Sequence, residues 1–168
     1  MKLPFIAMAL AALIAAPLAW SHDYHMADLM IDHPWSRPTP PGTPMGVGYM
    51  AITNNADSKA TLVGASSPRA GHVSLHQTIM DDGVMRMQPL DNGLEIAPGQ
   101  TVKLEPNGYH LMLEKLASPL KAGERVPVTL RFRKRDPINI ELSVQSLDDA
   151  PGMMKENGAM GHSGHSME

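Results

Sequence analysis

The chain has 168 residues, enough for one domain with a hydrophobic core, and it contains no cysteine. Its 17 acidic and 14 basic side chains give a formal net charge of −3 and a pI of about 6.2, so charge offers no case for nucleic-acid binding. The lack of cysteine excludes disulfides, a blue-copper thiolate site and a lipid-anchored lipoprotein.

The first 21 residues have the layout of a secretory signal peptide. Lys2 is followed by an apolar run over residues 3–20, after which polar sequence begins. The small residues Ala19 and Ser21 predict a mature start at His22, and cleavage after Ala19 is the alternative. A retained membrane anchor is a further alternative, because the run is about as long as the ~18 residues that a span needs. We therefore expect an exported protein.

Residues 22–148 are predicted to form one all-β domain. Short runs with β-branched residues alternate with the turn-forming residues Gly, Pro, Asn and Asp, and no stretch shows sustained helical periodicity. Evenly spaced short strands favour a Greek-key sandwich or barrel. The predicted strands are 28–35, 46–54, 59–66, 71–80, 84–89, 93–97, 101–105, 109–114, 125–133 and 138–146.

Four side chains in the middle of this domain form a donor set typical of a soft-metal site. They are two imidazoles and two thioethers, all neutral: His76, Met87, His110 and Met112. Thioether sulfur combined with imidazole nitrogen selects Cu(I) over harder divalent ions. Since an uncompensated ion charge is costly to bury, we expect the site to be shallow and partly wet.

More ordinary interpretations of these residues exist. A methionine on a strand is usually core filler, and a single histidine is more often a surface or hydrogen-bonded residue than a ligand. The total of 14 methionines in 168 residues weakens the first interpretation. His72 shares a strand face with His76 and is interpreted as solvent-exposed, with a supporting or spare ligand role as the alternative.

The dipeptide Asp82-Gly83 predicts a hairpin with a two-residue type I′ turn, which needs positive φ at both central residues. Strand alternation then places five side chains on one face, namely His76, Thr78, Met80, Met85 and Met87. His76 and Met87 become diagonal neighbours about 7–8 Å apart at the backbone. His110 and Met112 share a face of a later strand, and the sequence leaves open whether that strand meets the hairpin.

The stretch from His76 to Met112 resembles the PCuAC family of periplasmic copper chaperones, which assist the copper centre of cytochrome c oxidase. In that family about ten residues separate a His from a Met, and about twenty-one separate this Met from a His-x-Met motif. Here ten residues separate His76 from Met87, and twenty-two separate Met87 from His110. We place the additional residue in the turn at Asp91-Asn92-Gly93, where it would not disturb the site.

The resemblance covers about residues 28–146. Asp81–Met87 looks like the family's hairpin, Gly108–Leu113 looks like its ligand strand, and Pro34–Arg37 with Gly48-Tyr49-Met50 resembles its N-terminal strands.

The resemblance implies a cupredoxin-like Greek-key β-sandwich that binds Cu(I) through His76, Met87, His110 and Met112 at an exposed site. It implies transfer to a copper-accepting protein, such as an oxidase subunit or its assembly factor, in the periplasm. It implies neither catalysis nor stable membrane insertion after signal cleavage.

Three alternative functions are open on the sequence alone. The same copper site would also serve sequestration and copper resistance. A sandwich with methionine in its core would instead be a protein-binding module without metal. A metallohydrolase would need carboxylates beside histidine and an open position for water, and only Asp81 and Asp82 lie near the motif.

Both ends of the chain carry further metal-binding side chains. Residues 149–168 are too poor in apolar side chains to pack, so we expect a flexible tail. We favour a copper-collecting role for it, with Cu(II) on histidine and Cu(I) on methionine, over solubilising disorder; this role requires a lower copper stoichiometry after the tail is deleted. At the start of the mature chain, His22 and His25 are candidate Cu(II) ligands, with a plain disordered start as the alternative. The tail candidates are Met153, Met154, Met160, His162, His165 and Met167.

Overall fold

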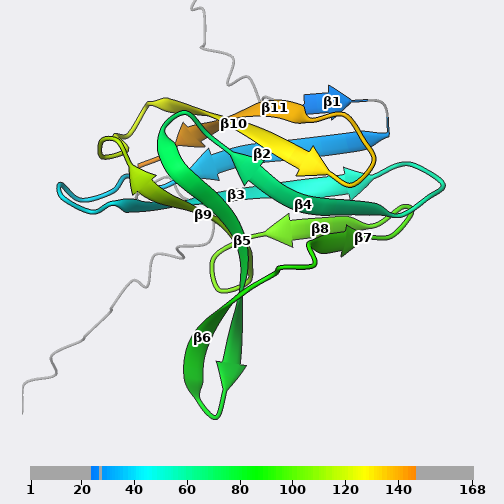
Figure 1. The fold of residues 1–168 in the computed structure, drawn as a ribbon, viewed down its shortest axis with the longest axis horizontal. Helices are drawn as coiled ribbons and strands as arrows, with labels where there is room; N and C mark the ends of the chain where they lie inside the picture. Colours follow the sequence, from blue (N-terminus) through cyan, green and yellow to red (C-terminus); the bar gives the residue numbers. More distant parts are fainter. Residues whose placement is uncertain (1–23, 27, 147–168) are drawn as a thin grey trace, which may run out of the picture.

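The computed structural model describes residues 24–26 and 28–146, which form an all-β domain (Figure 1). Ten of its strands match the ten predicted runs, and the short β1 was not predicted because three residues are too few to show a period. None of the described residues forms a helix, so this part of the chain contains no helix that could cross a membrane. The strands are β1 (Tyr24–Met26), β2 (Leu29–Ser36), β3 (Met45–Asn54), β4 (Ala60–Ser66), β5 (Ala70–Asp81), β6 (Val84–Pro89), β7 (Leu94–Ile96), β8 (Thr101–Leu104), β9 (Tyr109–Leu116), β10 (Arg125–Phe132) and β11 (Ile138–Val144).

Hydrogen bonds join the strands into one continuous sheet, which folds over a shared core to give a β-sandwich. Their order is β6-β5-β9-β8-β3-β2-β11-β10-β4-β7, with β1 on β2 and β9 also paired with β3. A β-bulge interrupts β2 between Asp32 and Trp35, where His33 has a φ of 44°. Bulges bend a strand and increase its twist, and β2 passes from here into a short parallel contact with β11. The predicted fold class is therefore confirmed.

Aliphatic side chains that alternate along the strands build the core. Along β10 the buried positions are Val126, Val128, Leu130 and Phe132, with exposed or half-exposed residues between them. A Cβ at Gly48 of β3 would lie 3.0 Å from Leu142 of β11 and 3.4 Å from Leu111 of β9. Strands β9 and β11, which are not neighbours in the strand order, therefore contribute to the same core.

The long strand β5 changes partner along its length. Its first part, Ala70–Gln77, pairs with β9, whereas His76–Asp81 pairs with β6. The two pairings overlap only at His76 and Gln77, so the end of the β5–β6 hairpin extends beyond the sandwich (Figure 1). Every residue of β6 is exposed.

The turn of this hairpin has the predicted geometry. Asp82 has a φ of 49° and Gly83 a φ of 78°, both positive as a type I′ turn requires. The register pairs Thr78 with Met87 and Met80 with Met85. The predicted shared face of His76 and Met87 is thereby confirmed.

Two glycines with similar backbone conformations provide a test of packing at the turn after β6. Gly93 (φ 84°) would place a Cβ 2.5 Å from the Leu62 carbonyl oxygen, whereas a Cβ at Gly99 (φ 71°) would meet nothing within 4 Å. Both Gly→Ala changes carry the left-handed penalty of about 1 kcal/mol. We expect Gly93→Ala to lower the free energy of unfolding by about 2 kcal/mol more than Gly99→Ala, because a backbone oxygen cannot move aside. Urea denaturation measures the difference, and equal losses would contradict this packing.

Candidate metal centre

The pairing of β5 with β9 brings the two candidate histidines together. His76 lies directly opposite His110 in the antiparallel register, so both side chains project from the same face of the sheet. Their ring centroids are 5.9 Å apart and the ring planes differ by 18°. The contact that the sequence left open is therefore made.

The two candidate thioethers lie on the same face as the histidines. Met112 follows His110 by two residues and lies opposite Ser74, while Met87 lies opposite Thr78 and diagonal to His76. Diagonal partners across antiparallel strands are about 7–8 Å apart at the backbone, within reach of long side chains. The four predicted donors thus lie on three adjacent strands, β6, β5 and β9.

The exposure of the donors differs strongly from one side of the cluster to the other. His110 is only 5% exposed, whereas Met87 on the projecting hairpin is 61% exposed. The expected wet, shallow surface is therefore correct for Met87, and His76 and Met112 are half-buried. At His110 the cluster lies deeper than predicted.

The hydrogen bond of His110 fixes which ring nitrogen is free. Its Nδ1 lies 3.1 Å from the carbonyl oxygen of Gly108. Since a carbonyl only accepts, Nδ1 must carry the proton and donate it. The lone pair of His110 Nε2 is then free to bind a metal.

A serine and a carboxylate orient the second ring in the same way. Ser74 Oγ donates its only proton to Glu114 Oε1 at 2.9 Å and lies 3.3 Å from His76 Nδ1. The hydroxyl must therefore accept from His76 Nδ1–H, which leaves the Nε2 lone pair free. Metal-binding histidines commonly hold their second nitrogen in this way.

The surroundings of His76 favour its neutral form. Burial lowers its pKa below the ordinary 6.5, and the neighbouring His110 and the more distant His72 act in the same direction. The carboxylates of Glu114 and Asp91 oppose this shift. Because only neutral imidazole has a lone pair for a metal, the lowered pKa keeps His76 competent at lower pH.

Sequence reasoning missed Ser74, Glu114 and the Gly108 carbonyl as supporting groups. Ser74 precedes His76 by two residues and Glu114 follows His110 by four, so strand alternation places both on the donor face. That signal was present in the sequence. Only the pairing of β5 with β9 showed that these two residues touch.

The other predicted ligands are not part of this cluster. His72 is exposed and lies opposite Glu114, in agreement with the solvent-exposed interpretation. His25 belongs to β1, but its side chain lies outside the described residues. The signal segment, His22 and the tail donors at 153, 154, 160, 162, 165 and 167 also lie outside them.

Methionine is not the core filler of this domain. Between residues 28 and 146 it occurs at positions 30, 45, 50, 80, 85, 87 and 112, and only Met50 belongs to the buried core. The core is otherwise built from Leu, Ile, Val, Ala and aromatic residues. The ordinary interpretation of Met87 as packing is therefore wrong.

Carboxylates contribute little at the hairpin. Asp81 faces Arg86 at 3.5 Å and Asp82 occupies the turn. Among residues 24–26 and 28–146, no three His, Cys, Asp or Glu side chains gather into a metal-binding group.

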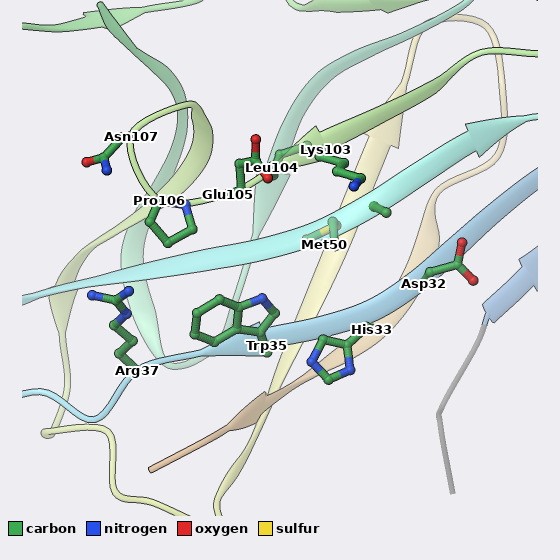
Figure 2. A pocket seen from close by; sticks show the side chains of 11 residues that line it. Asp32, His33, Trp35, Arg37, Met50, Lys103, Leu104, Glu105, Pro106 and Asn107 are labelled. Atoms are coloured by element: carbon green, nitrogen blue, oxygen red, sulfur yellow. The ribbon is translucent and has the colours of Figure 1, made fainter. Parts of the chain in front are cut away.

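A separate cavity of about 640 Å³ lies between β2, β3, β8 and the loop after β8. Figure 2 shows Arg37, Trp35 and His33 along one side and Glu105, Pro106 and Asn107 on the other. The Arg37 guanidinium lies 5.7 Å from the Trp35 ring centroid and 5.9 Å from that of Tyr49. None of the four candidate donors lines this cavity, so its size does not mark the metal centre.

The fold and the donor arrangement can be compared with known proteins. The copper-bound PCuAC domain from PmoF2 superposes with a TM-score of 0.64 at 26% identity, covering 74% of this chain and 98% of that domain. Apo-DR1885 from Deinococcus radiodurans gives a TM-score of 0.51 at 27% identity, covering 87% and 97%. The chain thus contains a β-sandwich domain of the PCuAC type.

The chain belongs to the LpqE-like family, described as "Putative lipoprotein LpqE-like", which matches residues 29–144. It is 38% identical over 91 residues to "Putative lipoprotein Lxx21020" of Leifsonia xyli subsp. xyli, covering 54% of this chain and 55% of that protein. It is 31% identical over 102 residues to "Uncharacterized protein RP573" of Rickettsia prowazekii, covering 59% and 56%. The match thus spans just over half the length of each relative.

Histidine NMR tests the deduced protonation of the two rings. In long-range ¹H–¹⁵N spectra at pH 8, His76 and His110 should both show the Nδ1–H tautomer, and His76 should titrate below 6.5. Ser74→Ala should move His76 toward the Nε2–H tautomer and leave His110 unchanged as an internal control. A wild-type His76 protonated at Nε2 would contradict the Ser74–Glu114 arrangement.

Proposed function

We propose that this protein is an exported Cu(I) chaperone that binds the ion through His76, Met87, His110 and Met112. One observation carries the proposal. Two imidazoles lie opposite each other with their Nδ1 atoms engaged and their Nε2 lone pairs free, on the face that also holds two thioethers. This is the donor chemistry that selects Cu(I).

The electrostatics of the cluster suit a monovalent ion. All four donors are neutral, so the bound ion would keep its single positive charge. The Glu114 carboxylate is linked to His76 by two hydrogen bonds, through Ser74, and offsets part of that charge without binding the metal. The lowered pKa of His76 weakens the competition of protons for its Nε2 lone pair.

The gradient of exposure supports transfer rather than storage. An acceptor can approach Met87, which is 61% exposed, but not His110, which is 5% exposed. Ligand exchange would therefore begin by replacing the Met87 thioether and end with release of His110. This gradient favours delivery over the alternative of copper sequestration.

The comparisons support the cellular setting of the proposal. The similar PmoF2 domain is copper-bound, and the family and one relative are described by the words "putative lipoprotein", which name a class of exported proteins. We propose a periplasmic location and a copper-accepting partner, with the copper centre of cytochrome c oxidase as the acceptor that the resemblance implies. The His22, His25 and tail donors are proposed as auxiliary copper ligands, and no catalytic role is proposed.

An anaerobic Cu(I) competition titration against a colorimetric chelator tests the four ligands. Replacing any one of them with Ala should weaken Cu(I) binding by about tenfold or more, because each supplies one bond to the ion. The Met changes should weaken Cu(I) more than Cu(II), and the His changes should weaken both. Met30→Ala, a half-buried methionine on β2, is the matched control and should bind as wild type.

Two results would oppose this assignment. Absence of any tight equivalent in the wild type would exclude the chaperone and leave a protein-binding module. Tight binding that survives all four substitutions would move the copper site elsewhere in the chain.

The affinity for Cu(I) should also decrease at low pH. Each imidazole that takes up a proton loses its ligand lone pair, so Cu(I) affinity should fall as pH drops below about 6. Because the pKa of His76 is lowered, its contribution should persist below the ordinary 6.5. His76→Ala should make the pH dependence shallower by about one proton, while Met87→Ala should leave its slope intact. Equal affinity at pH 7 and pH 5 would exclude histidine ligands.

A further inference from the structure

The β5–β6 hairpin sorts its side chains into two chemically distinct faces. Charged and branched residues occupy one face, where Asp81 pairs with Arg86. The other face continues outward from His76 through Thr78 and carries three methionines, Met80, Met85 and Met87. Toward its tip, this second face consists of thioethers alone.

The backbone register brings Met80 and Met85 close together. The N–H of Thr78 donates to the Gly108 carbonyl, so Thr78 turns its backbone groups away from β6. Met80, two residues along, has the same orientation, which makes Met80 and Met85 a non-hydrogen-bonded pair. In such a pair the Cα atoms are about 4.5 Å apart and the side chains approach most closely.

The exposed fractions of these methionines show that their side chains are accessible to solvent. Met80 is 67% exposed and Met85 is 52% exposed, and Met87, at 61%, is more exposed than His76, His110 or Met112. No apolar core lies beneath them, because this end of the hairpin extends beyond the sandwich (Figure 1). Packing therefore does not account for three methionines here.

The residue types favour a soft ion over a protein as the occupant of this face. A surface that only docked an apolar partner would be served by the Leu, Ile and Val that fill the core. Ile79 and Val84 belong to the opposite face, while sulfur is concentrated on the face that leads to His76. Thioether sulfur is the donor that distinguishes Cu(I).

We infer that Met80, Met85 and Met87 form a second, all-thioether Cu(I) site, from which the ion passes to and from the histidine pair. The inference rests on the proposed function, because Met87 is shared with the main site. The movement is an exchange of neutral ligands at an ion whose oxidation state does not change. Cu(I) leaves the Met80 and Met85 sulfurs, retains Met87 and gains imidazole nitrogen.

The test uses the full chain with ¹³C-labelled methionine methyl groups and anaerobic Cu(I) as the probe. The first equivalent should shift the methyl signals of Met87 and Met112. Further Cu(I), which competes with the first ion for Met87, should shift those of Met80 and Met85. The outer site has no titratable ligand, so shifts of Met80 and Met85 should persist at pH 5. Met30→Leu serves as the matched control, because that methionine lies on β2 away from the hairpin.

A double substitution separates sulfur chemistry from apolar contact. Met80→Leu with Met85→Leu keeps the apolar surface but removes two donors. It should leave the affinity of the tight equivalent within about threefold of wild type and slow Cu(I) removal by a chelator by about tenfold. Unchanged removal kinetics would overturn the inference.

The two proposals fail in different ways. If Met87 and Met112 respond to Cu(I) while Met80 and Met85 do not at any ratio, the outer site is wrong and the main site stands. If none of these four methyl groups responds, the proposed function itself fails. If Met80 and Met85 respond but Met112 and the histidines do not, the main site fails and the outer site stands alone.

Discussion

The antiparallel register between β5 and β9 is the constraint on which the rest of the site depends. It places His76 opposite His110 and Ser74 opposite Met112, so that donors and supporting groups share one face. Because side chains alternate with a period of two, a slip of one residue would send one of the two sets into the core. Leu111 and Leu113 hold this register, since they fill the core only when His110 and Met112 lie on the opposite face of β9.

The second constraint is the turn at Asp82-Gly83, which determines which side chains of β6 share a face with His76. Two residues with positive φ close the hairpin and put Met87 on the same face as His76. A turn of three residues would have reversed which β6 side chains face His76, and it would have left the thioether on the face of Ile79 and Asp81. The site therefore needs one long-range pairing held by the core and one local pairing held by the turn.

These two constraints explain how much of the molecule could be predicted from its sequence. The alternation of apolar and polar residues, with turn-forming residues between the runs, located ten strands. The Asp82-Gly83 dipeptide predicted the hairpin register. Both signals are local in the sequence. The contact between His76 and His110 joins residues 34 positions apart, and no local pattern reports it. The Gly108 carbonyl acts through local backbone geometry, which residue types do not reveal. Ser74 acts through its contact with Glu114, which could not be assigned before the strands were paired.

The chemistry of the four candidate donors bears on how the proposed copper chaperone could release its ion. A thiolate that gives up a metal must regain a proton at neutral pH or remain charged, which couples transfer to proton supply. Thioether sulfur and the Nε2 lone pair are neutral before and after the ion leaves. The fixed Nδ1–H groups also hold both rings in place when one sulfur is replaced, so the remaining donors keep their geometry. Transfer from this face would then depend on the order in which an acceptor reaches the donors, and the exposure of Met87 places it first.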